Sequence, residues 1–131
     1  MTRAKFFRKT FTPDALGKLF PKDRADRFFE ALLGDAQEGA YDIRLVFKDA
    51  GNNRLDFEFH LTPRPGRCLR CNLTYGLPDV FSRHPVIDIQ GLVGAIDHLM
   101  DGNGRCSGWS VGRVREVRSD LHCIPLTIAY V

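Results

Sequence analysis

The sequence lacks any long hydrophobic run. None of its apolar stretches approaches the roughly 18 consecutive residues that a membrane-spanning helix requires. The basic first ten residues are not followed by the apolar segment of a secretory signal. We therefore expect a cytoplasmic protein without a membrane partner. In that compartment its four cysteines are reduced thiols unless a metal or a catalytic disulfide holds them.

Recognisable catalytic and nucleotide-binding motifs are also missing from the sequence. It contains no Gly-x-x-x-x-Gly-Lys phosphate loop, no Gly-x-Gly-x-x-Gly dinucleotide motif and no Gly-x-Ser-x-Gly nucleophile elbow. Ser82, His84 and Asp88 are the residue types of a triad, but a helix-leading turn fixed by Pro78 and Pro85 is the better explanation of this segment. The pattern favours a protein that is not an enzyme.

A strong excess of one charge is absent as well. The sequence has 19 basic and 16 acidic residues, which gives a net charge of +3. The acidic residues weaken the potential of any basic surface. Because nucleic-acid binding needs a strongly basic footprint, we treat nucleic acid as a weak alternative partner and expect a protein partner instead. Hydrophobic residues make up 44% and charged residues 27% of the 131 residues, as in an ordinary single globular domain.

Helix signals occupy the N-terminal quarter and one later segment. Residues 1–11 are predicted to form a basic, partly mobile arm whose aromatic side chains dock on the body. Thr12 and Pro13 are typical of a helix start, which places a short helix immediately after the arm. Apolar residues at helical spacing predict further helices over 22–33, ended by Gly34, and over 89–100.

Alternating apolar and polar residues mark the strands. The alternation runs over 41–48, interrupted only by Val46, and over 54–61, and turn residues separate the two runs, so the sequence predicts a β-hairpin over 41–61. Further strands are predicted near 68–75, 107–118 and 121–131, and residues 76–85 are expected to form a loop.

The resulting order is ααβββαββ, with an arm over 1–11 and a single domain over 12–131. Hairpin-connected strands make a mainly antiparallel sheet, and amphipathic helices must cover one of its faces. The predicted fold class is therefore α+β, with two layers and a five-stranded sheet.

Cys68 and Cys71 have the spacing of a zinc knuckle. A structural zinc ion usually takes two such pairs, and the remaining cysteines and histidines supply no second close pair. If residues 68–75 form a plain strand, the two sulfurs point to opposite faces and cannot share an ion, unless a β-bulge near Gly66 turns one of them. Zinc on Cys68 and Cys71, a redox pair and a plain strand remain alternatives at this point.

Polar residues of the hairpin and of the turn after it are the candidate binding residues. His60 is expected on the polar face of the second strand, beside Arg44 and Glu58. Arginines surround the cysteine pair, and their planar guanidinium groups bind carboxylates bidentately. The candidate set is His60, His84, Arg64, Arg67 and Arg70.

The stretch Cys68-Leu-Arg-Cys71-Asn-Leu-Thr-Tyr75-Gly-Leu-Pro78, with Phe81-Ser-Arg-His84-Pro85, resembles a family of small uncharacterised proteins from sulfate-reducing bacteria. The similarity runs from about Phe11 to the C-terminus. Members often carry the label "pancreas/duodenum homeobox protein 1". A homeodomain is a three-helix fold with a basic recognition helix, which the strand pattern here contradicts. The resemblance implies a bacterial origin and a cytoplasmic location, and no activity.

The sequence therefore favours a non-enzymatic binding or accessory module that works through the polar sheet face and the arginine-rich turn. A zinc-stabilised domain with Cys68 and Cys71 as ligands is the first alternative. A small ligand-binding protein or enzyme, with a pocket between the sheet and the helices, is the second.

Overall fold

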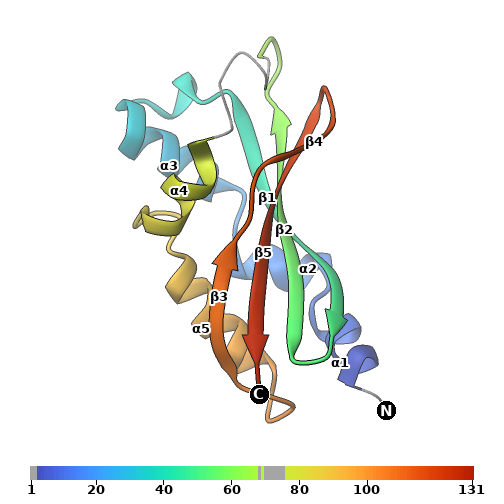
Figure 1. The fold of residues 1–131 in the computed structure, drawn as a ribbon. Coiled ribbons are helices and arrows are strands. Elements are labelled where there is room, and N and C mark those ends of the chain that lie inside the picture. The colour runs from blue at the N-terminus through green and yellow to red at the C-terminus, as the bar shows by residue number, and fades with distance from the viewer. Residues whose placement is uncertain (1–2, 68, 70–75) are drawn as a thin grey trace.

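The computed structural model describes residues 3–67, 69 and 76–131 (Figure 1). The elements follow in the order α1 (Arg3–Thr10), α2 (Pro13–Leu19), α3 (Asp23–Leu33), the 3-10 turn η1 (Ala36–Glu38), β1 (Tyr41–Gly51), β2 (Arg54–Pro63), α4 (Leu77–Arg83), α5 (Ile89–Leu99), β3 (Cys106–Val111), β4 (Arg115–Arg118) and β5 (Leu121–Tyr130). None of these helices is long and apolar enough to span a bilayer.

The strands form one antiparallel sheet. Its order is β1-β2-β5-β3, and β4 pairs with the first residues of β5, on the edge that β3 also uses. The helices lie beside the sheet (Figure 1). The predicted α+β class, with helices against a mainly antiparallel sheet, is confirmed.

The hairpin of β1 and β2 is confirmed, with strands slightly longer than the alternation predicts. Asn53 in its turn has a φ of 59°, a left-handed conformation that asparagine tolerates better than most residues. The alternating apolar side chains all point to one face of the sheet, where they are almost completely buried: Tyr41, Ile43, Leu45, Leu55, Phe57, Phe59 and Leu61.

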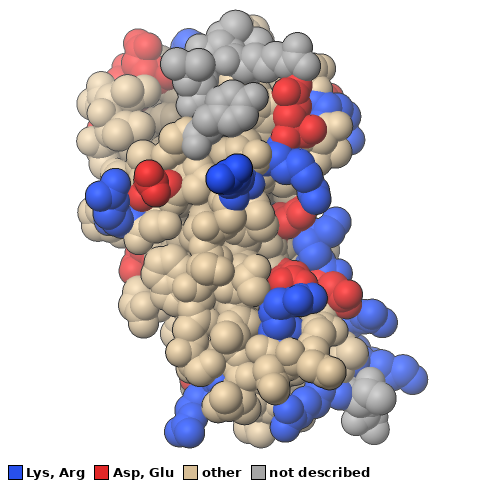
Figure 2. Space-filling model, viewed as in Figure 1, with Lys and Arg blue, Asp and Glu red and all other residues tan. Residues whose placement is uncertain are grey.

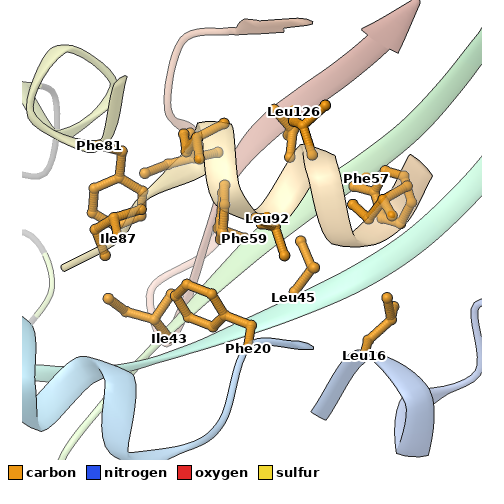
Figure 3. Close-up of a cluster of buried hydrophobic side chains, with 14 of the residues drawn as sticks. Leu16, Phe20, Ile43, Leu45, Phe57, Phe59, Phe81, Ile87, Leu92 and Leu126 are labelled. Atoms are coloured by element: carbon orange, nitrogen blue, oxygen red, sulfur yellow. The ribbon is translucent and has the colours of Figure 1, made fainter. Parts of the chain in front are cut away.

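Phenylalanine dominates the core between sheet and helices (Figure 3). Phe59 meets Phe20 and Phe81 edge to face, with ring centroids 5.4 Å away in both pairs. Such arrangements add about 0.5–1.5 kcal/mol each to the free energy gained by burying the rings. Phe59 of β2 therefore contacts both the end of α2, which precedes the hairpin, and α4, which follows it.

Helix ends follow the capping signals in the sequence. The Thr12 side chain accepts a hydrogen bond from the Ala15 N–H at 3.2 Å, and Pro13 occupies the first turn of α2. Gly34 ends α3 with a φ of 84°. Asp88 accepts from the Gly91 N–H at 3.1 Å at the start of α5.

Two segments differ from the sequence-based expectation because aromatic side chains draw them into the core. Residues 3–10 form the helix α1, which the expectation of an arm does not include. The expected docking of its aromatic side chains is confirmed, since Phe7 is fully buried and stacks 5.9 Å from Phe11. Leu77–Arg83 is the helix α4 rather than a loop, and its Phe81 is fully buried. The strand expected over 68–75 lies outside the described residues.

The single strand expected over 107–118 is divided into β3 and β4 by Pro125 of β5. The Pro125 carbonyl accepts a hydrogen bond from the Gly112 N–H at 2.8 Å, so the missing proline N–H faces the same neighbouring edge. Proline cannot donate there, and the ladder resumes only at Arg115, after one extra residue. The result is a bulge that directs β4 along the N-terminal part of β5.

We predict that Gly112→Ala destabilises the protein by about 1–3 kcal/mol, because a Cβ atom at this position would lie 2.7 Å from Cγ of Pro125. Gly108→Ala is the matched control, since a Cβ atom there would meet nothing within 4 Å. Urea denaturation of both variants measures the difference. Equal stability of the two variants would show that the bulge tolerates a side chain at Gly112.

Candidate functional site

The face of the sheet that is turned away from the helices carries a continuous row of functional groups. Arg44 of β1 lies directly opposite His60 of β2, His60 lies opposite Cys123 of β5, and Cys123 lies opposite Arg115 of β4. Partners directly opposite each other in an antiparallel sheet project to the same side. The register therefore places four reactive or charged side chains from four strands on one face, which we call the open face.

Glu58 completes a cluster on the open face, because it precedes His60 by two residues on β2. Its Oε1 lies 3.0 Å from Nε2 of His60, and its Oε2 accepts a hydrogen bond from Nη2 of Arg115 at 2.9 Å. One donor atom each from Glu58, His60 and Cys123 lie within 4.8 Å of one another. Glu58 is only 8% exposed and Cys123 only 1% exposed, so the sheet holds the cluster away from bulk water.

The surroundings of Cys123 favour its protonated form. Burial raises the pKa of the thiol, and the neighbouring Glu58 carboxylate raises it further, while Arg115 opposes this shift. A cysteine nucleophile needs the opposite shift, because the thiolate is the reactive form. The residues around Cys123 are therefore poorly suited to nucleophilic catalysis by this thiol.

A hollow of about 550 Å³ adjoins the cluster on the open face. His60 contributes to its wall, and the other lining residues are Lys22, Asp42, Ile43, Arg44, Thr62, Arg118 and Leu121. Figure 2 shows Lys and Arg interspersed with Asp and Glu down the side of the molecule where the strands lie.

Most of the charge in this hollow is positive and available. Within the described part of the chain, Lys22 and Arg44 have no ion-pair partner. Arg118 pairs with Asp120, at an exposed position. The lining carboxylate of Asp42 already receives a hydrogen bond from Arg64 at 3.1 Å. The hollow can therefore offer cationic groups to an anionic guest.

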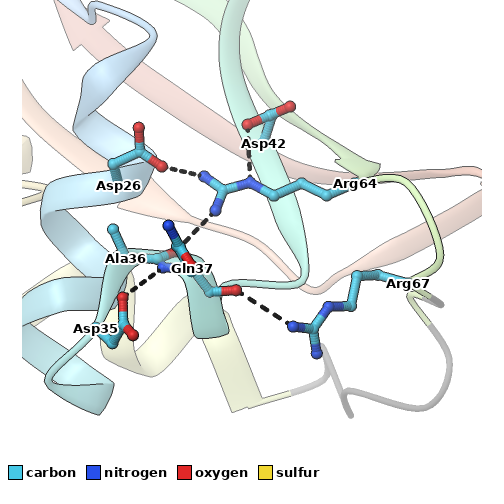
Figure 4. Close-up of polar contacts among 7 residues, drawn as sticks. All are labelled: Asp26, Asp35, Ala36, Gln37, Asp42, Arg64 and Arg67. Carbon is cyan, nitrogen blue, oxygen red and sulfur yellow. Dashed lines mark hydrogen bonds and ion pairs between the residues drawn. The ribbon is translucent and has the colours of Figure 1, made fainter.

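Arg64 joins several elements of the fold through its guanidinium group (Figure 4). Its guanidinium group donates to Asp26 of α3 at 2.6 Å, to Asp42 of β1 at 3.1 Å and to the Ala36 carbonyl of η1 at 2.9 Å. It also lies 5.4 Å from the ring centroid of Phe29. With three hydrogen-bonded partners on three elements and a side chain only 18% exposed, its donors are already engaged.

Arg67 and His84 also have partners within the fold. Arg67 donates to the Gln37 carbonyl of η1 at 3.2 Å (Figure 4). His84 follows α4, accepts from the Val86 N–H at 3.2 Å and packs edge to face on Phe28. Of the binding residues expected from the sequence, the structure brings only His60 to the open-face cluster. Cys68, Arg70 and Cys71 lie outside the described residues.

Glu58, Cys123 and Arg115 belong to the site but are not among the sequence candidates. Alternation along 54–61 places Glu58 on the face of His60, which is a usable signal. Nothing in the sequence pairs β2 with β5, because these strands are separated by about sixty residues and two helices. The cluster depends on that pairing, so the sequence alone does not predict that Cys123 and Arg115 lie beside Glu58 and His60.

Comparisons with known proteins assign no family. The chain matches no protein-family model, and no curated protein or solved structure is significantly similar to it. The site must therefore be interpreted from its own geometry.

Cys106, the other cysteine among the described residues, has a structural environment at the start of β3. Its N–H donates to Oδ1 of Asp97 at 2.6 Å, and its Sγ lies 3.7 Å from Sδ of Met100. Burial, together with the Asp97 carboxylate, raises the pKa of the Cys106 thiol from 9.0 to about 11.

We predict that the free energy of unfolding falls as pH rises from 9 to 11, partly through Cys106. The unfolded thiol ionises near pH 9, whereas the folded thiol keeps its proton to about pH 11, so ionisation in this window favours the unfolded chain. Denaturant unfolding of the wild-type protein and of Cys106→Ala across this window tests the prediction. The variant should lose less stability, and parallel pH profiles would contradict the assignment.

We also predict that Arg64→Ala lowers the free energy of unfolding by about 1–3 kcal/mol, because it removes charge-assisted hydrogen bonds to three elements. Arg54→Ala is the matched control: it removes a single exposed ion pair with Asp56 and should cost about 0.5 kcal/mol or less. Thermal and urea denaturation give both values. Similar small losses of stability in the two variants would show that the contacts of Arg64 do not stabilise the fold.

Proposed function

We propose that this protein is a non-enzymatic binding module whose open face receives an acidic segment of a protein partner. The observation that carries the proposal is the hollow of about 550 Å³ with unpaired Lys22 and Arg44 in its wall. A hollow of this size is large enough to take one or two side chains of a partner.

The chemistry of the wall supports a carboxylate-bearing guest. Arg44 offers a planar fork of N–H donors, which matches the two oxygens of a carboxylate, and Lys22 adds a mobile point charge. Thr62 and Leu121 supply a hydroxyl group and apolar surface beside these cations. The cationic groups that serve this role are thus Arg44 on β1 and Lys22 on the segment before α3, rather than those in the turn that contains Arg64.

The sheet itself supports a binding role more than a catalytic one. Strands hold the side chains of the open face at fixed spacing, which suits recognition of a complementary surface. Electrostatic attraction at such a surface mainly guides association and selects the partner, so its contribution should weaken as salt concentration rises.

The direct test is a titration of isotope-labelled protein with a hexaglutamate peptide, followed by amide chemical shifts in NMR. The expected shifts are confined to residues 42–46, 58–62 and 118–123 and diminish at high salt. Arg44→Glu and Lys22→Glu should each weaken binding by at least about tenfold, since each replaces an attraction with a repulsion.

Arg83→Glu on α4 is the control, because it makes the same change in net charge at an exposed position of the helix layer. It should leave the affinity for hexaglutamate within about twofold of wild type, because Arg83 belongs to α4 and is not among the residues that line the hollow. Equal effects of Arg83→Glu and Arg44→Glu, or shifts spread over the helices, would contradict the proposal.

A further inference from the structure

We infer that Glu58, His60 and Cys123 form a binding site for a zinc ion on the open face. This inference uses residues that the acidic-partner proposal does not require, apart from His60 on the shared wall. Its ligands are different residues from Cys68 and Cys71, the pair that the sequence suggests.

The geometry of the three donors fits a tetrahedral ion. Ligand atoms about 2.0–2.3 Å from a tetrahedral zinc ion lie about 3.3–3.8 Å from one another. The donor atoms of Glu58, His60 and Cys123 are all within 4.8 Å of one another, and the Glu58–His60 pair is at 3.0 Å. Small side-chain rotations therefore suffice to bring all three into coordination.

The backbone fixes these donors before any ion arrives. Glu58 and His60 are two residues apart on β2, and Cys123 lies directly opposite His60 on β5. All three come from paired strands rather than from loops. A site on paired strands loses little conformational entropy when it binds an ion.

The set of donor types selects the metal. A thiolate sulfur and an imidazole nitrogen favour zinc and similar borderline ions over calcium or magnesium, which prefer oxygen. A carboxylate completes a common zinc ligand set, and three protein ligands leave the fourth position to water. When the ion binds, the Cys123 thiol releases its proton to solvent, and the thiolate and the carboxylate together neutralise the two positive charges of the ion.

Arg115 fits the role of an outer partner that orients the carboxylate. It holds Oε2 of Glu58 at 2.9 Å, so that Oε1 is directed at Nε2 of His60, and an ion bound by both atoms would replace their 3.0 Å contact. Its side chain is 64% exposed, so it can adjust when a divalent cation enters. Glu58 is also the only carboxylate among the described residues that is buried, and its contacts with His60 and Arg115 offset the cost of that burial.

The test uses the full chain, freed of metal with a chelator and kept reduced, and titrated with Co²⁺ as a spectroscopic probe for zinc. An equimolar complex should show a near-ultraviolet band from thiolate-to-cobalt charge transfer, and Zn²⁺ should displace the cobalt. Cys123→Ser should abolish the band. His60→Gln should weaken Co²⁺ binding by at least about 100-fold, more than the loss of an outer partner costs.

Two controls make each outcome decisive. The double variant Cys68→Ser/Cys71→Ser should keep the band, and Lys22→Glu should keep it even though it weakens hexaglutamate binding. Circular dichroism verifies folding, and His60→Gln serves as the test if Cys123→Ser does not fold. The inference is overturned if the wild-type chain shows no charge-transfer band, if the band persists in Cys123→Ser, or if it disappears only in the Cys68/Cys71 variant.

Discussion

The antiparallel pairing of β2 with β5 is the constraint on which the rest of this structure depends. It brings Phe57 opposite Leu126 and Phe59 opposite Ile124 on the core face, and His60 opposite Cys123 on the open face. Each buried apolar side chain contributes about 1.5–3 kcal/mol, so the core face sets the register. A slip of one residue would expose that entire face and disperse the polar cluster at the same time.

The two faces of this pairing explain the arrangement of charge. Hydrophobic burial on the core face fixes the backbone of β2, and this backbone places Glu58 in a buried position. A buried carboxylate destabilises the fold unless it is paired. Arg115 reaches Glu58 because the bulge opposite Pro125 brings β4 alongside the start of β5. Arg64, in contrast, bridges α3, η1 and β1, and it binds Asp42 in the wall of the hollow. The positive charge available to a partner comes from Lys22 and Arg44.

The sequence predicts much of the fold and only part of the site. Alternation is enough to predict the hairpin over 41–61, and capping residues such as Thr12 and Gly34 predict helix ends, because these signals are local. Helix α1 and helix α4 escape prediction because long-range burial of Phe7 and Phe81 stabilises them. The same limit applies to the site. His60 is recognisable from its strand, whereas Cys123 joins it only through a sheet order that no local pattern encodes.

The central claim is the register of β2 against β5, and backbone proton contacts in NMR test it most directly. The register in this structure predicts nuclear Overhauser contacts that pair His60 with Cys123 and Phe59 with Ile124. Contacts that instead pair His60 with Ile124 would shift the register by one residue. Cys123 would then leave the open face, and both the cluster and the metal site would be contradicted.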